Sequence, residues 1–425
     1  MSLLELFPDT AAVEQRELAV GGMSTAALAD EFGTPLVVYC ERTVLGAGRA
    51  YLQAAPEALV LYGVKAFPNL ALVRLLAAEG LGADVSTLGE LEYARRAGVP
   101  GERIVVHGNN KSDDELRAAV AVGARFVVLD ALDEIARAAH AGVGRVLVRV
   151  TPGIEADTHP AIRTAHRGSK FGLPPEQALA AIGEARDAGL DVVGLHLHIG
   201  SQLLDTQAAR TSVDWLGGFA AECRAELGWQ PQVVDLGGGL GIEYVPGERP
   251  PPIADFVSAL LERLEHAWTL HGLDLPNVIL EPGRSLVGRA GITLYRVGVV
   301  KQASETTTYV AVDGGMSDNP RPQLYGARYS ALLANRAGEK PSGTYTVCGK
   351  HCESGDVLIE SLGLPEPRRG DLLAVAGTGA YTLAMGSNYN AVPRPAAVLV
   401  ADGQARLIRR RESIDDVLGH EEASG

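Results

Sequence analysis

Short apolar runs alternate with helix-forming stretches from about residue 59 to residue 281 of this chain. Each run is rich in β-branched and other apolar residues and is bounded by turn-forming residues, which is typical of a buried strand. The stretches between the runs carry helix signals: Ser112 and Glu115 form a capping box, and Gly123 is placed to end that helix. Thr87 opens another helix, which ends at Gly98. The eight predicted strands are residues 59–65, 81–85, 103–107, 125–130, 145–150, 192–198, 232–236 and 277–281.

Eight strands that alternate with helices predict a (β/α)8 TIM barrel, whose active-site groups lie at the carboxyl ends of the strands. The alternative is an open, doubly wound sheet. Such a sheet requires a dinucleotide-binding glycine fingerprint near its first strand, and the sequence has none there.

The pattern changes after residue 281. Short alternating runs, such as residues 292–297 and 396–400, are separated by glycine, proline and aspartate turns, which favours a mostly antiparallel β domain. The first 35 residues do not follow the barrel pattern. We therefore predict an α/β barrel plus a β domain, with residues 1–35 packed on the β domain, the barrel at 36–285 and the C-terminal β domain at 286–425.

Composition narrows the class of protein. A length of 425 residues suits two domains, and a net charge of −14 argues against nonspecific binding to nucleic acid or an anionic membrane. No apolar run is long enough to span a bilayer, and the N-terminus lacks the pattern of a secretory signal. The four cysteines form neither a disulfide framework nor paired metal-binding motifs, so we expect a cytoplasmic protein with no metal site. They are Cys40, Cys223, Cys348 and Cys352.

Residues with versatile chemistry stand where the predicted strands end. The first strand ends in Lys65, and a lysine amine in an enclosed pocket can form a Schiff base because desolvation lowers its pKa. A strand-end lysine taken alone more often extends into solvent. The seventh strand ends in three glycines, residues 237–239, and the eighth ends in Glu281. Barrels commonly bind phosphate after strands seven and eight, so a phosphate site plus a Schiff-base lysine indicates pyridoxal phosphate.

The motifs at these positions closely resemble those of the diaminopimelate decarboxylase family of pyridoxal-phosphate enzymes, within the alanine-racemase-like fold group. The resemblance covers nearly the whole chain and implies a cofactor-binding barrel, a β domain and a homodimer whose active sites are shared across the interface. Gly63 and Phe67 differ from the alanine and asparagine of many members, but neither difference removes a reacting group. The motifs are residues 62–66 (YGVKA), 107–111 (HGNNK), 196–201 (HLHIGS), 237–241 (GGGLG), 281–284 (EPGR) and 352–356 (CESGD).

The resemblance implies which residues hold the cofactor. Lys65 would carry it as an aldimine, His198 would stack on its ring, and Glu281 would pair with the pyridine nitrogen. A carboxylate there stabilises the protonated ring, the stronger electron sink that a decarboxylation carbanion needs, whereas an alanine racemase typically has an arginine. Asp84 is as readily a strand-end turn residue as a partner of Lys65. The other implied cofactor-binding residues are Ser201, Gly237, Gly238, Gly239, Gly283, Arg284 and Tyr381.

The resemblance also implies the substrate-binding residues. Arg321 and Tyr325, together with Arg284, match the family's carboxylate binders, because arginine forms a two-pronged pair with a carboxylate. Glu353 matches a substrate-binding glutamate, and Tyr381 would touch both cofactor and substrate. Cys352 would donate a proton to the quinonoid carbon, and the family places it with Glu353 in the partner subunit's site. A buried small hydrophobe is the alternative interpretation of Cys352.

The expected activity is decarboxylation of meso-2,6-diaminopimelate to L-lysine and CO2. One alternative is a related ornithine, arginine or polyamine-pathway decarboxylase, but ornithine decarboxylases have an aspartate directly after the cysteine, where this chain has Glu353. Another alternative is a non-catalytic pyridoxal-phosphate-binding homologue. Such proteins tend to lose the lysine or the cysteine, and this chain keeps both Lys65 and Cys352.

Overall fold

The computed structural model describes residues 3–152, 169–198 and 200–422 of the chain. Their contacts divide the chain into two compact units. The barrel unit comprises Ala47–Gly241 and Arg249–Ser285; the β unit comprises the chain up to Gly46, Ile242–Glu248 and the chain from Leu286 onward. Among the described residues, no helix combines the length and the apolar character that crossing a bilayer requires.

The barrel unit contains parallel strands that close in the order β10-β11-β12-β5-β6-β7-β8-β9. This confirms the predicted (β/α)8 barrel, and every strand agrees with its predicted range to within two residues at each end. The strands are buried on both faces, and side chains such as Leu61, Val128 and Leu147 fill the interior. The strands are β5 (Leu59–Gly63), β6 (Gly82–Val85), β7 (Ile104–Val106), β8 (Phe126–Leu129), β9 (Arg145–Arg149), β10 (Asp191–His196), β11 (Val233–Asp235) and β12 (Asn277–Leu280).

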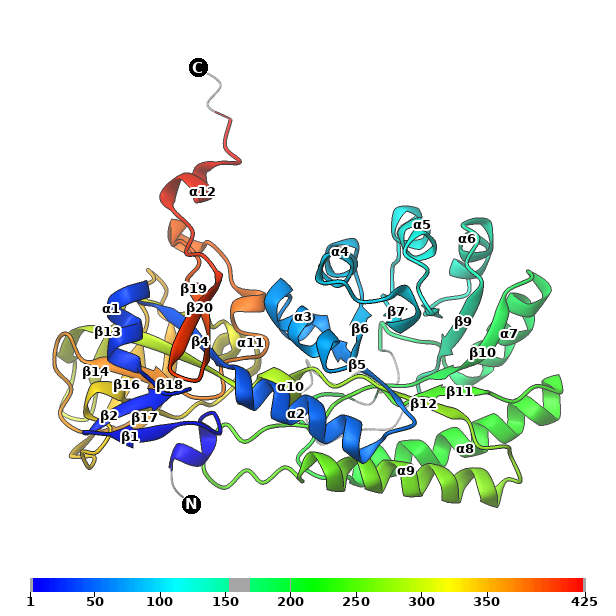
Figure 1. Cartoon of the computed structure of the whole chain (residues 1–425), viewed down its shortest axis with the longest axis horizontal. Helices are drawn as coiled ribbons and strands as arrows, with labels where there is room; N and C mark the ends of the chain where they lie inside the picture. The colour runs from blue at the N-terminus through cyan, green and yellow to red at the C-terminus, as the bar shows by residue number, and fades with distance from the viewer. Residues whose placement is uncertain (1–2, 153–168, 199, 423–425) are drawn as a thin grey trace. The chain divides into compact units, whose positions relative to one another are not determined.

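Helices surround these strands (Figure 1). Two of them begin and end at the predicted signals: Thr87 caps α4, which stops at Gly98 in a left-handed conformation, and α5 has the capping box of Ser112 and Glu115. The helices are α3 (Leu70–Ala78), α4 (Leu88–Ala97), α5 (Asp113–Ala121), α6 (Glu134–His140), α7 (Pro175–Asp187), α8 (Gln207–Leu227) and α9 (Ile253–Leu270), and the division between the units falls inside α2 (Glu41–Ala54) and α10 (Arg284–Val287).

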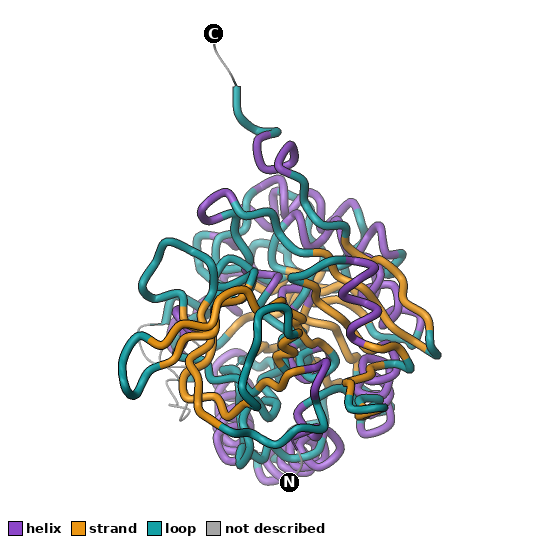
Figure 2. The backbone as a smooth tube through the Cα atoms, turned by 90° about the vertical axis from the view of Figure 1, so that its left-hand side faces the viewer, coloured by secondary structure: helices purple, strands orange, loops and turns teal. Residues whose placement is uncertain are grey.

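The β unit contains a three-stranded sheet, β1-β2-β3, and a nine-stranded sheet whose main path is β17-β16-β14-β13-β4-β19-β20 (orange strands in Figure 2). Most pairs are antiparallel, which confirms the predicted β domain, while β4 with β19 and β14 with β16 are parallel. The elements are β1 (Ala12–Glu14), β2 (Glu17–Val20), β3 (Met23–Ser24), α1 (Thr25–Phe32), β4 (Leu36–Cys40), β13 (Gly291–Gln302), β14 (Thr308–Val312), α11 (Arg321–Tyr325), β15 (Ala331–Leu333), β16 (Gly343–Cys348), β17 (Val357–Leu364), β18 (Leu372–Val375), β19 (Ala396–Ala401), β20 (Gln404–Arg409) and α12 (Ile414–Leu418).

The start of the chain is built into the β unit. Leu6, Phe7 and Leu18 share a core with the strand residues Val38 and Val398. β4 lies between β13 and β19 and hydrogen-bonds to both. The boundary drawn by contacts therefore falls at Gly46, whereas the sequence led us to begin the barrel at residue 36. Ile242–Glu248, which we placed in the barrel, also groups with the β unit, because Ile242 and Tyr244 pack in a second core there.

Candidate functional site

Lys65 lies just beyond the end of β5. The strand stops at Gly63, two residues before the predicted end, and Lys65 occupies a single 3-10 turn, Val64–Ala66. Its Nζ is 3.1 Å from Oδ2 of Asp84, at the end region of β6. The Asp84 side chain is 1% exposed and the Lys65 side chain 46% exposed, so the amine is held beside a buried carboxylate and is itself open to solvent. The arrangement favours Asp84 as a partner of Lys65 over a simple turn residue.

Glu281 lies at the centre of a buried cluster at the strand ends. Its Oε1 is 2.5 Å from Nε2 of His107, and its Oε2 is 3.4 Å from Nε2 of His196. Burial opposes the charge of Glu281, but the two imidazoles outweigh that effect and hold its pKa well below its ordinary value. Burial and the neighbouring charge of Glu281 raise the pKa of Asp235 well above its ordinary value. The two carboxyl groups therefore differ: the ionised form is favoured at Glu281 and the protonated form at Asp235.

Sequence reasoning missed His107, His196 and Asp235 as members of this cluster. Each is a polar residue in or directly after an apolar strand, which was the available signal, but their convergence on Glu281 depends on the closing of the barrel. Together with Glu281 their ligand-type atoms lie within 4.8 Å of one another, a set that could also hold a divalent cation. The expectation from the sequence that the protein has no metal site therefore remains a prediction. Burial lowers the pKa of His196 to about 3, so that ring is neutral.

A second group of predicted residues gathers after β10, β11 and β12. The guanidinium of Arg284 donates to Oγ of Ser201, with Nη2 at 3.0 Å. Gly239 packs so closely on Gly200 that a Cβ there would come within 2.8 Å of the Gly200 carbonyl oxygen. Gly237 and Gly239 have φ angles of 64° and 118°, which favour glycine. Ile199, within the HLHIGS motif, lies outside the described residues.

His198 joins this group through its ring. Its Nδ1 accepts a hydrogen bond from the Gly238 N–H at 3.3 Å, and a Cβ on Gly237 would lie 2.7 Å from the same nitrogen. Burial, with the positive charges of Lys65 and Arg149, holds the pKa of His198 well below its ordinary value. The ring is therefore neutral, as the acceptor role of Nδ1 requires.

Glu90 follows the cap Thr87 by three residues but does not complete a capping box with it. Its carboxylate accepts from the Ser86 N–H at 2.7 Å, one residue before the cap. Burial and the nearby charge of Asp84 raise the pKa of Glu90, while the hydrogen bond from the Ser86 N–H lowers it.

Gly283 lies beside Gly63. A Cβ added to Gly63 would be 3.5 Å from the Gly283 Cα. The Gly63 N–H donates to the Pro282 carbonyl, which ties the end of β5 to the EPGR turn.

The donor set of the barrel unit fits pyridoxal phosphate. A run of glycines, a serine hydroxyl and a guanidinium suit a phosphate dianion, because glycine lets backbone N–H groups approach an anion closely. An ionised, buried Glu281 suits a protonated ring nitrogen, and the amine of Lys65 suits an aldehyde. The lysine, the glycine run, the serine, Glu281 and the guanidinium all follow the carboxyl ends of strands of the same barrel.

Arg321 is a buried cation of the β unit. It opens α11 and is 5% exposed, with its guanidinium 4.7 Å from the ring centroid of Tyr244. Nη1 donates to the Tyr329 hydroxyl at 2.5 Å, and Nε has no hydrogen-bond partner among the described residues. Within the described part of the chain, no carboxylate forms an ion pair with Arg321. Arg321 is therefore not a solvated surface charge, and a buried cation of this kind suits an incoming carboxylate.

Tyr325 ends the same helix, and its hydroxyl contacts Sδ of Met385 at 3.9 Å. Tyr381 adopts a φ of 59°, a left-handed conformation that is uncommon for an aromatic residue and that occurs often at functional sites. The neighbouring Thr382 hydroxyl donates to the Thr378 carbonyl, which closes the loop that carries Tyr381.

Cys352 and Glu353 lie on an exposed loop. The Cys352 N–H donates to Oδ1 of Asn390 at 3.0 Å. The alternative interpretation of Cys352 as a buried hydrophobe is therefore wrong, whereas Cys40 and Cys223 are buried. Oε1 of Glu353 accepts weakly from the Gly355 N–H at 3.3 Å, which leaves its carboxylate facing solvent.

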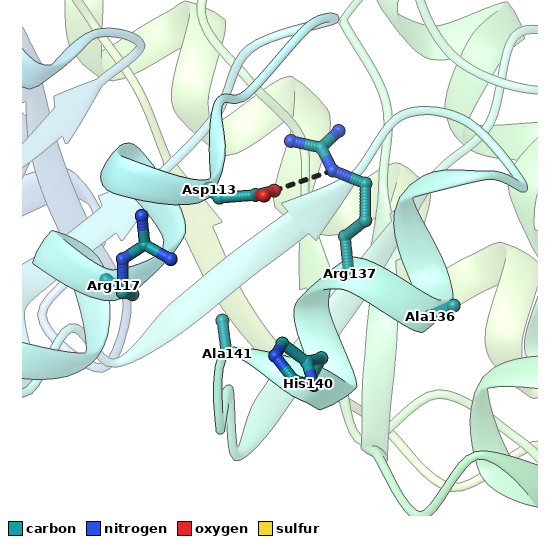
Figure 3. A pocket seen from close by; sticks show the side chains of 6 residues that line it. All are labelled: Asp113, Arg117, Ala136, Arg137, His140 and Ala141. Carbon is teal, nitrogen blue, oxygen red and sulfur yellow. Dashed lines mark hydrogen bonds and ion pairs between the residues drawn. The ribbon is translucent and has the colours of Figure 1, made fainter.

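An outer pocket of about 290 Å³ lies on the barrel unit, between α5 and α6 (Figure 3). Asp113 and Arg137 point toward one another across it, with 2.8 Å between Oδ1 and Nε. None of the predicted site residues lines this pocket, and its lining contains no lysine, cysteine, serine or glycine. It is therefore distinct from the groups described above.

Comparison with known proteins identifies the family of this chain. The family described as pyridoxal-dependent decarboxylase, pyridoxal binding domain, matches residues 42–288. A diaminopimelate decarboxylase of Actinosynnema pretiosum is 44% identical over 422 residues, covering 98% of this chain and 95% of that protein. One of Bacillus subtilis is 41% identical over 417 residues, covering 94% of each. The crystal structure of the M. jannaschii diaminopimelate decarboxylase in complex with L-lysine has a TM-score of 0.90 and 34% identity, covering 98% of each chain. This chain belongs to the diaminopimelate decarboxylase family of pyridoxal-dependent decarboxylases.

Proposed function

We propose that this chain converts meso-2,6-diaminopimelate to L-lysine and CO2 with the help of pyridoxal phosphate. When bound, the cofactor supplies an electron sink for the carbanion that remains after CO2 leaves. Lys65 provides the amine that holds its aldehyde end, and Asp84 orients that amine. Ser201, residues 237–239 and Arg284 hold the phosphate.

Glu281 would keep a proton on the ring nitrogen of the bound cofactor. Its buried carboxylate is ionised because His107 and His196 favour the charge, and a nearby anion favours the protonated ring. His198, which is neutral and accepts from the Gly238 N–H, would lie against the ring of the bound cofactor. After the loss of CO2, Cys352 delivers a proton to the substrate carbon and regains one from solvent.

The observation that carries the choice of substrate is the burial of Arg321, which forms no ion pair with a carboxylate of the described residues. meso-Diaminopimelate has an amino-acid group at each end, and the end that does not react presents a carboxylate and an ammonium. Arg321 with Tyr325 suits the carboxylate, and Glu353 suits the ammonium. Lysine and ornithine lack the second carboxylate and would leave the guanidinium of Arg321 unpaired.

The proposal extends to assembly and location. Cys352 and Glu353 would act in the site of a second copy of the chain, so a homodimer would carry two complete sites. Each of the four cysteines is free, which supports action in a reducing compartment such as the cytoplasm.

A substrate panel tests the proposal. The purified protein with pyridoxal phosphate is given meso-diaminopimelate, L-lysine, L-ornithine or L-arginine, and CO2 release is measured. We expect turnover of diaminopimelate and discrimination against the others by about 10⁴- to 10⁵-fold, because a site built for a polar group rejects an analogue that lacks it. Equal turnover of ornithine would point to a polyamine-pathway decarboxylase, and no turnover of any amino acid to a non-catalytic homologue.

A further inference from the structure

The Cys352 loop, residues 351–356, is exposed at its tip and buried at both ends. The His351 and Asp356 side chains are 0% and 2% exposed, and Nδ1 of His351 lies 2.8 Å from Oδ2 of Asp356. The same oxygen accepts from the His351 backbone N–H at 2.9 Å. A single buried carboxylate therefore closes the loop on itself.

The Asp356 carboxylate is also anchored to a separate segment. Its Oδ1 accepts from the Met316 N–H at 2.7 Å. Gly315 makes room for it, because a Cβ at Gly315 would come within 2.6 Å of both carboxylate oxygens. Gly349 is similarly close to the carboxylate from the other side. Three hydrogen bonds therefore hold the Asp356 carboxylate, and two glycines, Gly315 and Gly349, leave the space that it occupies.

The segment after β18 holds the other side of the loop. The His351 ring stacks on Tyr389, with ring centroids 5.9 Å apart and 20° between the ring planes. The next residue, Asn390, accepts the Cys352 N–H in a left-handed conformation with a φ of 53°. Nε2 of His351 is buried without a hydrogen-bond partner among the described residues, so the polar contacts of the ring are made through Nδ1 alone.

We propose that His351 and Asp356 are positioning residues for Cys352. They fix the backbone on both sides of the exposed thiol and so restrict the range of positions that the thiol can occupy. Proton delivery requires hydrogen-bond reach, and a displacement of about 1 Å can cost about 100-fold in rate. The inference rests on the proton-donor role proposed for Cys352.

Two substitutions at His351 separate the hydrogen bond from the ring. His351→Asn keeps an amide donor near the position of Nδ1 but loses the ring that stacks on Tyr389. His351→Phe keeps a ring but cannot bond to Asp356. Asp356→Asn provides a third variant, which leaves the ring intact and disturbs the acceptor of the His351 N–H.

The experiment measures kcat and KM for meso-diaminopimelate, and amide hydrogen exchange of the peptide that contains residues 350–357, in the full-length protein loaded with cofactor. Cys352→Ser is the reference for loss of the thiol. We expect His351→Phe and Asp356→Asn to lower kcat by about 10- to 100-fold and to speed exchange in the loop. Exchange in β14 and β18 should not change, and His351→Asn should keep kcat within about threefold of the unaltered protein.

The outcomes distinguish the two proposals. A full rate in His351→Phe and Asp356→Asn beside an impaired Cys352→Ser protein would overturn the positioning role alone. A loss in His351→Asn beside a full rate in His351→Phe would also overturn it, because the ring and not the hydrogen bond would then matter. A full rate in Cys352→Ser would overturn the role of Cys352 and, with it, this inference.

Discussion

Lys65 and Asp84 form an ion pair in which the carboxylate is almost fully buried and half of the lysine side chain is open to solvent. The ion pair holds the Lys65 amine at the end of the barrel and leaves it accessible to solvent. An amine held in this way is available to a carbonyl compound.

Removal of the Lys65 amine should abolish turnover. Lys65→Ala and Lys65→Arg should both lose activity and fail to retain the cofactor after borohydride reduction, because neither provides a nucleophilic amine. Lys65→Arg keeps a cation beside Asp84 and is the matched control for the ion pair. Peptide mapping after reduction of the unaltered protein should find the cofactor on Lys65. Full turnover in Lys65→Ala would contradict the proposed role.

Neutralising Glu281 should slow catalysis while the cofactor still binds. Glu281→Gln should lower kcat by about 10²- to 10³-fold, the usual cost of removing an electrostatic stabiliser. Asp235→Asn is the matched control, because the raised pKa of Asp235 favours its protonated form and an amide resembles a neutral carboxyl group in shape. Its kcat should change far less. Similar losses in both variants would mean that the cluster is structural. Rates come from steady-state kinetics and cofactor content from absorbance.

Arg321→Met should damage the use of diaminopimelate far more than cofactor binding. A methionine retains much of the packing against Tyr244 but removes the partner of the substrate's carboxylate, which costs about 2–5 kcal/mol in kcat/KM. Arg328→Met is a matched control, because Arg328 is 74% exposed and lies in the same unit. An unchanged preference for diaminopimelate over ornithine in Arg321→Met would remove Arg321 from the site.

Two inactive chains should complement one another if the sites are shared. Lys65→Ala and Cys352→Ala chains, mixed and allowed to exchange subunits, would form heterodimers with one complete site. Random pairing should restore about a quarter of the normal number of sites. Mass spectrometry verifies exchange, and separate samples of each variant are the controls. No recovery after verified exchange would indicate a site built within one chain.

Stability should depend on the titration of Asp318. Burial raises the pKa of Asp318 to about 7, although Tyr295 and the Gly315 N–H favour its charged form. Its ordinary pKa is near 3.8, so the stabilising contribution is complete below pH ~4 and is lost as the pH rises through about 7. The loss amounts to a few kcal/mol. Chemical denaturation from pH 5 to pH 8 should show a steeper fall for the unaltered protein than for Asp318→Asn. Parallel curves would contradict the assignment.

The barrel could be predicted because its signals are local. Each strand is a continuous apolar run, and caps such as Thr87 and Ser112 mark the helix starts. The buried cluster around Glu281 could not be predicted as a cluster, because His107, His196 and Asp235 meet only when the strands close into a barrel. The end of β5 was placed two residues late because the chain turns directly after Gly63 into the 3-10 turn Val64–Ala66, which contains Lys65.

The candidate site shows the same division between local and distant information. Motifs marked Lys65, Arg321 and Cys352, since each stands in a short characteristic run. The burial of Arg321 between two tyrosines depends on Tyr244, which comes from a loop that we had assigned to the barrel. Likewise, β4 reads as an ordinary apolar strand, and nothing in its own sequence reveals its neighbours in the sheet.

The position of β4 between β13 and β19 has a consequence for synthesis. Both neighbours lie near the end of the chain, so β4 leaves the ribosome long before either strand that pairs with it. Until then its apolar residues and backbone groups have no sheet to join, and unpaired strand edges are prone to aggregate. The barrel unit has all its strands between Leu59 and Leu280 and can fold first. A nascent chain halted before β13 would therefore carry a complete barrel beside an unpaired, aggregation-prone segment.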